Sequence, residues 1–209
     1  MKRAFACWSV LLLLAALFAP GPVRAATTTI VAFGDSLTAG YGVTPEDAFP
    51  VRLEAALKAR GRDVRVINAG VSGDTSAGGL ARLDWSLADK PNLIVLELGS
   101  NDMLRGIDPG STEANLDAIL RKLTDAKIPV LLCGMFAARN LGPDYVGRFD
   151  AIYPKLAQKY GVPLHPFFLD GVALDAKLNQ GDGMHPNPAG VKIIVDRIAP
   201  VVEKLLPAQ

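Results

Sequence analysis

The chain has 209 residues, of which 50% are hydrophobic, 21% charged and 7% aromatic, and its formal net charge is +1. This is the balance of a globular protein, and 20 Gly and 15 Pro are too few for a collagen-like or low-complexity chain. A chain of this length can bury one hydrophobic core without needing disulfides or a structural metal. We therefore expect a single folded domain.

The first 25 residues have the pattern of an export signal. Lys2 and Arg3 give a charged start, residues 4–19 form an almost unbroken apolar run, and residues 20–22 break that run shortly before Ala25. The apolar run is shorter than the roughly 20 residues that a helix needs to span a bilayer, which favours a cleaved signal over a membrane anchor. We predict cleavage near Ala25 and a periplasmic or secreted protein.

The predicted mature domain, residues 26–209, has 19 basic and 21 acidic side chains. It lacks the cluster of Lys and Arg that a protein needs to bind nucleic-acid phosphates, so we expect no nucleic-acid partner. Its one cysteine, Cys133, lies in an apolar run. A thiol buried in such a strand stays protonated and unreactive, so we expect neither a disulfide nor a cysteine nucleophile.

Five apolar runs have the length and composition of strands and alternate with helical patterns. The predicted strands cover residues 29–33, 64–68, 93–98, 130–135 and 162–167. Strands that are apolar on both sides must be covered by helices on both faces. The expected fold class is therefore α/β, a three-layer α/β/α sandwich with a five-stranded parallel sheet.

Three segments place apolar residues at the spacing of one helix face. The apolar positions are Phe49, Leu53, Ala56 and Leu57 in the first segment, Leu116, Ile119, Leu120 and Leu123 in the second, and Val191, Ile194, Val195, Ile198, Val202 and Leu205 in the third. Ser111 is expected to cap the second helix, with Glu113 in its first turn.

Polar, glycine-rich segments follow the first three predicted strands, and a fourth lies near the C-terminus. Their sequences are GDSLTAGYG at 34–42, GVSGDT at 70–75, GSND at 99–102 and DGMHPN at 182–187. Ligands of open parallel sheets bind at the carboxyl ends of the strands. These segments are therefore where we look for function.

Ser36 stands where a strand is expected to turn into a helix, which would expose its hydroxyl as a nucleophile. The G-x-S-x-G motif is absent, and Gly34-Asp35-Ser36 alone is also typical of a turn and helix cap. His185 lies three residues after Asp182 and favours catalysis, because Asp182 could orient the imidazole while His185 takes the Ser36 proton. The alternative for Asp182 and His185 is a metal site, but the chain offers too few further ligands, so we expect no metal.

Acyl transfer also requires N–H donors for the developing oxyanion. The backbone N–H groups of Ser36 and Gly73 and the side-chain amide of Asn101 could form such an oxyanion hole. Gly73 alone is equally typical of a turn, and Asn101 alone of a loop cap.

Together the four segments resemble the SGNH hydrolases, the GDSL-type esterase and lipase family. In that family they supply the nucleophilic serine, an oxyanion glycine, an oxyanion asparagine, and a histidine with an aspartate three residues earlier. The resemblance assigns these roles to Ser36, Gly73, Asn101, His185 and Asp182. It covers essentially the whole mature chain and implies the flavodoxin-like SGNH hydrolase fold.

Within the family, the residues at 34–42, 72–75, 97–99 and 101–106 are most similar to bacterial periplasmic thioesterase I, lysophospholipase and arylesterase enzymes. This similarity implies a monomer without cofactors or a stable membrane anchor. It also implies small-molecule substrates, namely acyl esters, acyl thioesters or lysophospholipids, hydrolysed through an acyl-enzyme. Ser100 departs from the pattern, since relatives often have Gly or Ala before the asparagine.

The segment 135–145 is similar in place to a mobile loop that covers the acyl chain in those relatives. We expect Met103, Leu104, Phe136 and Leu141 to line an acyl groove, although ordinary packing explains each of them as well. The alternatives are a carbohydrate O-acetylesterase and a non-catalytic ligand-binding protein with the same fold. Glu97 interrupts an apolar strand, and the sequence assigns it no role.

Overall fold

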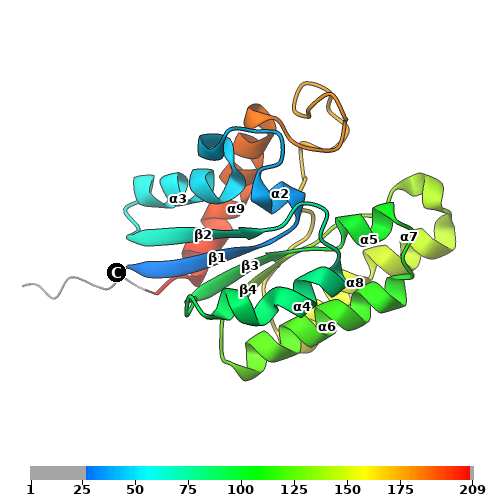
Figure 1. Cartoon of the computed structure of the whole chain (residues 1–209), viewed down its shortest axis with the longest axis horizontal. Coiled ribbons are helices and arrows are strands. Elements are labelled where there is room, and N and C mark those ends of the chain that lie inside the picture. Colours follow the sequence, from blue (N-terminus) through cyan, green and yellow to red (C-terminus); the bar gives the residue numbers. More distant parts are fainter. Residues whose placement is uncertain (1–26, 208–209) are drawn as a thin grey trace, which may run out of the picture.

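The computed structural model describes residues 27–207, so the predicted export signal lies outside the described residues. Five strands form one sheet in the order β2-β1-β3-β4-β5, and every neighbouring pair is parallel (Figure 1). The strands are β1 (Thr28–Gly34), β2 (Val64–Gly70), β3 (Leu93–Glu97), β4 (Val130–Cys133) and β5 (Leu164–His165). The predicted α/β class with a five-stranded parallel sheet is confirmed.

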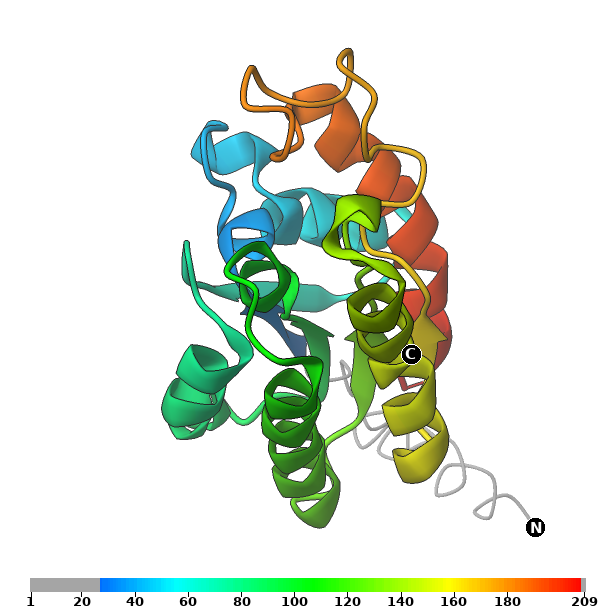
Figure 2. The ribbon, with the colours of Figure 1, turned by 90° about the vertical axis from the view of Figure 1, so that its right-hand side faces the viewer.

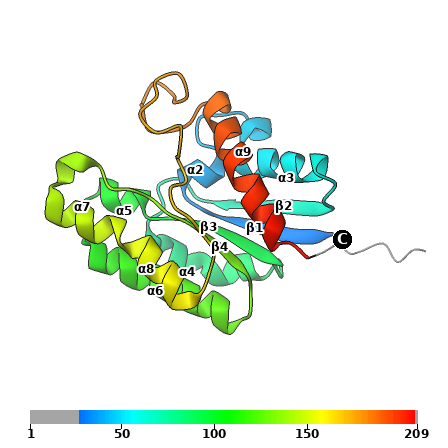
Figure 3. The ribbon, with the colours of Figure 1, turned by 180° about the vertical axis from the view of Figure 1, so that it is seen from behind.

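Helices cover both faces of the sheet (Figures 1 and 3). On one face lie α3 (Phe49–Ala59) and α9 (Pro188–Leu205), and on the other lie α4 (Ser76–Leu87), α6 (Pro109–Asp125) and α8 (Ile152–Tyr160). The connections contain the short helices α2 (Ser36–Ala39), α5 (Ser100–Leu104) and α7 (Pro143–Asp150) and the 3-10 turns η2 (Pro45–Asp47) and η3 (Arg139–Leu141). Among residues 27–207, no helix is both long and apolar enough to cross a membrane.

Burial along the strands follows from these layers. Every residue of β3 and β4 is buried, as expected for strands covered by helices on both faces. At the edge of the sheet, β2 instead alternates, with Val64 and Val66 buried and Arg65 between them exposed. The core therefore lies on both sides of the central strands.

The fifth strand is shorter than the predicted run over 162–167. Pro163 and Pro166 flank Leu164 and His165, and proline has no N–H to donate to a strand ladder. The pairing with β4 therefore ends after two residues.

The start of α6 also differs from the prediction. The cap is Asp108 and not Ser111, because the Asp108 carboxylate accepts the Gly110 N–H at 2.8 Å and Pro109 occupies the first helical turn. Proline is favoured there since its missing N–H would have no partner in the helix.

The strand order places β1 and β3 side by side, so that the chain leaves their carboxyl ends into α2 and α5 at the same end of the sheet. Figure 2 looks onto this end of the molecule. It is the switch point of the sheet, where open α/β folds bind their ligands.

Candidate active site

Ser36 is the first residue of α2, directly after β1. Asp35 caps this helix, and its carboxylate accepts the Leu37 N–H at 2.9 Å. Gly40 ends the helix with φ 85°, in the left-handed region that favours glycine, and its N–H donates to the Ser36 carbonyl at 3.1 Å. Ser36 is buried at the start of a capped helix and also lines a cavity, so the cap and a cavity-facing serine, which the sequence offered as alternatives, occur together.

His185 and Asp182 continue a chain of contacts from Ser36. The Nε2 atom of His185 lies 3.0 Å from Ser36 Oγ, and its Nδ1 atom lies 2.6 Å from Asp182 Oδ2. The backbone N–H groups of His185 and Met184 donate to Asp182 Oδ1 and, with the imidazole, lower the pKa of Asp182 to about 2. Asp182 is therefore ionised at neutral pH, in the place where it can fix the His185 tautomer.

Gln180 connects the histidine loop to the serine loop. Its Nε2 donates to the Tyr41 carbonyl at 2.8 Å and to the Pro186 carbonyl at 3.0 Å, and its backbone N–H donates to the His185 carbonyl at 2.8 Å. The Tyr41 ring packs on the imidazole with 4.7 Å between centroids. Sequence reasoning gave neither residue a role, because Gln180 lies outside the four polar segments and Tyr41 entered only as part of the segment 34–42.

The two further residues expected in the oxyanion hole are placed differently. Asn101, in the first turn of α5, lines the same cavity as Ser36 and His185. Its Nδ2 donates one hydrogen to Asp35 Oδ2 at 2.9 Å, which leaves the second amide hydrogen for a ligand. Gly73 has φ 83° and does not line the cavity, although Arg105 binds its carbonyl at 2.7 Å.

Glu97 lies behind Gly34 and fills the space that a side chain there would need. A Cβ atom at position 34 would be 2.1 Å from Thr38 Oγ1 and 2.5 Å from Glu97 Oε2. Position 34 therefore requires glycine because of close packing.

Arg82 of α4 joins the ends of two strands. Its guanidinium donates to the carbonyls of Gly34 and Ala69, both at 2.8 Å, and pairs with Asp74 at 2.6 Å. The same guanidinium lies 4.1 Å from the centroid of the Phe33 ring. The segments that follow β1 and β2 are thus held together by one side chain that the sequence did not single out.

The cavity at Ser36 has a volume of about 660 Å³. Most of its wall is apolar and consists of Leu37, Met103, Leu104, Met135, Phe136, Ala137, Ala138, Phe167, Leu169, Ala173, Leu174 and Met184. Three of the four residues expected in an acyl groove are in this wall. The fourth, Leu141, lies in η3 and does not line the cavity.

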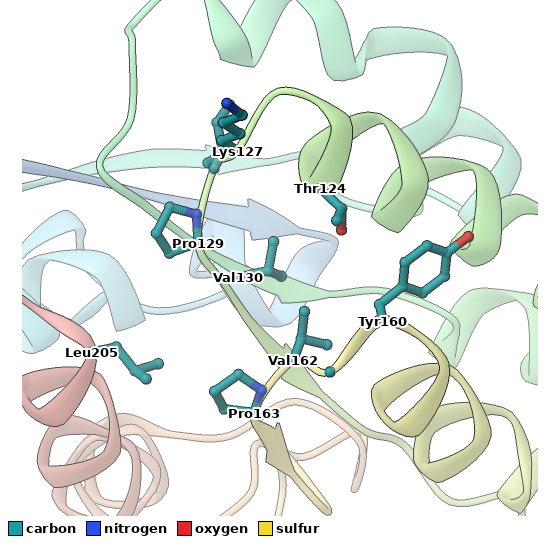
Figure 4. A pocket seen from close by; sticks show the side chains of 10 residues that line it. Thr124, Lys127, Pro129, Val130, Tyr160, Val162, Pro163 and Leu205 are labelled. Carbon is teal, nitrogen blue, oxygen red and sulfur yellow. The ribbon is translucent and has the colours of Figure 1, made fainter.

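A second cavity, of about 330 Å³, lies at the amino-terminal end of β4 and β5 (Figure 4). Its wall has one charged side chain, Lys127, and contains no carboxylate, imidazole or thiol. Within residues 27–207, no three His, Cys, Asp or Glu side chains are grouped to hold a metal ion. Of these two cavities, the one at Ser36 is therefore the one with an imidazole in its wall.

Comparison with known proteins gives one family. Residues 32–193 match the GDSL-like Lipase/Acylhydrolase family. The chain is 40% identical over 184 residues to Esterase TesA of Pseudomonas aeruginosa, covering 88% of this chain and 92% of that protein. It is 40% identical over 183 residues to thioesterase 1/protease 1/lysophospholipase L1 of Escherichia coli K12, covering 87% and 86%. Among solved structures, the SGNH-hydrolase family esterase AlinE4 is 48% identical with a TM-score of 0.74, covering 88% of this chain and all of that one.

The chain belongs to the GDSL-like lipase/acylhydrolase family of SGNH hydrolases. Its relatives are named esterase, thioesterase, lysophospholipase and arylesterase, so the predicted enzyme class, a carboxylic-ester hydrolase, is confirmed.

Proposed function

We propose that the protein is an exported serine esterase that hydrolyses acyl esters and acyl thioesters, lysophospholipids among them, through an acyl-enzyme on Ser36. One observation carries this proposal: His185 bridges Ser36 Oγ at 3.0 Å and Asp182 Oδ2 at 2.6 Å. A histidine held in this way by a carboxylate can accept the serine proton and later return it to a leaving group.

The reaction has two steps, formation of the acyl-enzyme and its hydrolysis by water. Ser36 Oγ attacks the acyl carbon while its proton passes to His185 Nε2, and Asp182 stabilises the imidazolium. The carbonyl oxygen, now negative, accepts hydrogen bonds from the N–H group of Ser36 and from Asn101 Nδ2, whereas Gly73, the third donor expected from the sequence, does not line this cavity. His185 then protonates the alcohol or thiol as it leaves. Water repeats these steps on the acyl-enzyme and releases the carboxylic acid.

The apolar wall supports an acyl chain longer than acetyl. A cavity of about 660 Å³ lined by methionine, leucine and phenylalanine side chains can bury an aliphatic chain, whereas an O-acetyl sugar needs polar partners for its hydroxyls. We assign the substrate-binding role to Met103, Leu104 and Phe136.

Residues 1–25 support export, because a charged start and an apolar run precede Ala25. Cleavage near Ala25 would release residues 26–209 as a monomeric hydrolase domain. N-terminal sequencing of the protein recovered from the periplasm or medium tests this step, because an uncleaved start at Met1 would contradict it.

The activity is tested with p-nitrophenyl esters from acetyl to palmitoyl. The protein starting at Ala26 should hydrolyse them, Ser36→Ala should abolish turnover, and the exposed Ser111→Ala should retain it. An optimum above acetyl supports an acyl esterase, whereas an acetyl optimum favours the acetylesterase. A folded protein without any turnover would instead be a ligand-binding protein.

A further inference from the structure

Two buried carboxyl groups lie next to each other behind Ser36. Glu97, the last residue of β3, is 0% exposed. Its Oε2 accepts the Thr38 hydroxyl at 2.8 Å and the Asp35 backbone N–H at 3.3 Å, and its Oε1 has no hydrogen-bond partner within residues 27–207. The reaction proposed above does not use this side chain.

Asp35 is equally buried but has more donors. Its carboxylate accepts the Leu37 N–H at 2.9 Å, the Asn101 amide at 2.9 Å and the Ser100 hydroxyl. Asp35 thus connects the helix that begins with Ser36 to the side chain of Asn101.

Two such carboxyl groups cannot both ionise cheaply, because each charge is desolvated and repels the other. Burial, followed by the negative charge of Asp35, raises the pKa of Glu97 well above its ordinary value. Burial also raises the pKa of Asp35, but its hydrogen bonds from Ser100, Leu37 and Asn101 act in the opposite direction. The ionised form is therefore better stabilised by hydrogen bonds at Asp35 than at Glu97. When the two groups hold one proton between them, that proton is on Glu97.

The neighbouring ionisable groups do not change the conclusion that Glu97 is protonated and Asp35 ionised. Burial raises the pKa values of Cys133 and Tyr153 well above the ordinary ones, so both groups are neutral at neutral pH. His185 acts on Asp35, where a positive imidazolium favours the carboxylate. Arg82 directs its hydrogen bonds to Gly34, Ala69 and Asp74 and to neither member of the pair.

We propose that Glu97 is a positioning residue that carries one proton at neutral pH and thereby keeps Asp35 ionised as the anchor of Asn101. This inference rests on the proposed function, in which Asn101 donates to the oxyanion. If Glu97 lost its proton, two negative charges would lie side by side in the same buried space. Their repulsion would push the Asp35 carboxylate away from Asn101 and Ser100.

Ser100 gives this chain an additional hydrogen-bond donor to the Asp35 carboxylate. Its hydroxyl and the Asn101 amide donate to the same oxygen, Asp35 Oδ2. Ser100→Ala removes a donor that favours ionised Asp35, so we expect kcat to fall about three- to tenfold at unchanged KM.

The decisive variant is Glu97→Gln, which has the shape of the protonated acid but cannot ionise. The control is Glu113→Gln, which only removes a surface ion pair with Lys155. At pH 7 we expect both variants to fold and Glu97→Gln to keep kcat within about threefold of wild type, whereas Glu97→Ala leaves a cavity and lowers kcat further.

The pH dependence separates positioning from simple packing. A raised pKa in the folded state stabilises the protein below the ordinary pKa of glutamate, and this stabilisation is lost as pH rises. The unfolding free energy of Glu97→Gln relative to wild type should therefore increase as pH rises above the ordinary pKa of glutamate, and wild type should lose more activity at alkaline pH than Glu97→Gln does. Glu113→Gln should show neither trend.

Three results would overturn the proposal. They are a Glu97→Gln protein that does not fold, a loss of kcat above about 100-fold at pH 7, and a stability difference from wild type that does not change with pH. The stability measurement needs no substrate. If wild type hydrolyses no ester, the proposed function fails, while the proton on Glu97 is still decided by the unfolding curves.

Discussion

His185 is bound to Asp182 through both its ring and its backbone. Nδ1 of His185 lies 2.6 Å from one carboxylate oxygen, and the backbone N–H of the same residue donates to the other at 3.0 Å. Asp182 therefore fixes the path of the main chain and the orientation of the imidazole at the same time.

Replacing Asp182 by Asn should disable the histidine without removing it. The Asn amide can donate to Nδ1, which stabilises the tautomer with its proton on Nε2, and this atom can no longer accept the Ser36 proton. We expect kcat for a p-nitrophenyl ester to fall about 10²- to 10⁴-fold at nearly constant KM. The exposed Asp144→Asn serves as control. A loss that appears only in KM would contradict this role.

The same carboxylate should contribute to stability at acidic pH. Its pKa is about 2 in the folded protein, below the ordinary value of 3.8, because backbone N–H groups bind the ionised form. The contribution is therefore complete above about pH 4 and is lost as pH falls toward 2. Urea unfolding should show wild type and Asp182→Asn converging over this range. If the unfolding free energies of wild type and Asp182→Asn differed by a constant amount down to pH 2, Asp182 would make no such contribution.

Gln180 should matter through its two side-chain donors. Gln180→Ala removes hydrogen bonds to the Tyr41 and Pro186 carbonyls, and we expect about 1–2 kcal/mol less stability and about tenfold lower kcat. Gln180→Glu should be at least as harmful, since it turns a carboxylate oxygen toward those carbonyls. Gln158→Ala, on the exposed side of α8, is the matched control for urea unfolding and kinetics. If Gln180→Glu kept the kcat of wild type, the two side-chain hydrogen bonds of Gln180 would not be needed to hold the histidine loop against the serine loop.

The cavity wall should determine the preferred acyl length. Met103→Trp fills part of the cavity and should lower kcat/KM for a decanoyl ester about tenfold or more, with acetyl changed less than about twofold. Leu141→Ala should leave the profile unchanged because Leu141 is outside the wall. The ester series measured on both variants checks this. A shift caused by Leu141→Ala alone would mean that the loop moves over the substrate.

Arg82 should stabilise the strand ends. Arg82→Met removes one donor from each of the Gly34 and Ala69 carbonyls and from the Asp74 carboxylate, so we expect the unfolding free energy to drop by about 2–4 kcal/mol. The surface variant Arg121→Met should change it by less than about 0.5 kcal/mol. If Arg82→Met and Arg121→Met lowered the unfolding free energy equally in urea, the hydrogen bonds of Arg82 would contribute nothing to stability.

The strands were predictable because burial between two helix layers leaves an uninterrupted apolar run, as in β3 and β4. The boundaries were harder. Pro163 and Pro166 lie inside the apolar run over 162–167 and restrict β5 to two residues, so the length of the run overestimates the strand. The helix α4 was not predicted, because Gly78 and Gly79 are poor helix formers. Gly79 packs closely against the core, since a Cβ there would lie 2.3 Å from the Leu98 side chain.

Some contacts of the site could be predicted from the sequence, and others could not. Asp182 and His185 are close in sequence, so that one local turn joins them, and Ser36 follows a recognisable strand. Gln180 and Arg82 act through backbone carbonyls, which every residue has and no motif records. Asp35 was recognised only as a cap, because its contact with Asn101 depends on the order of β1 and β3 in the sheet.

The packing at Gly34 has a consequence for how this site can change. Glu97 and Thr38 occupy the volume of the missing side chain, so positions 34, 38 and 97 share one space across three elements. A Cβ atom at position 34 would also lie 2.6 Å from the backbone carbonyl oxygen of Glu97, which no change of side chain removes. Glycine is therefore needed at position 34 whatever side chains stand at positions 38 and 97, and variation of this site has to proceed around it.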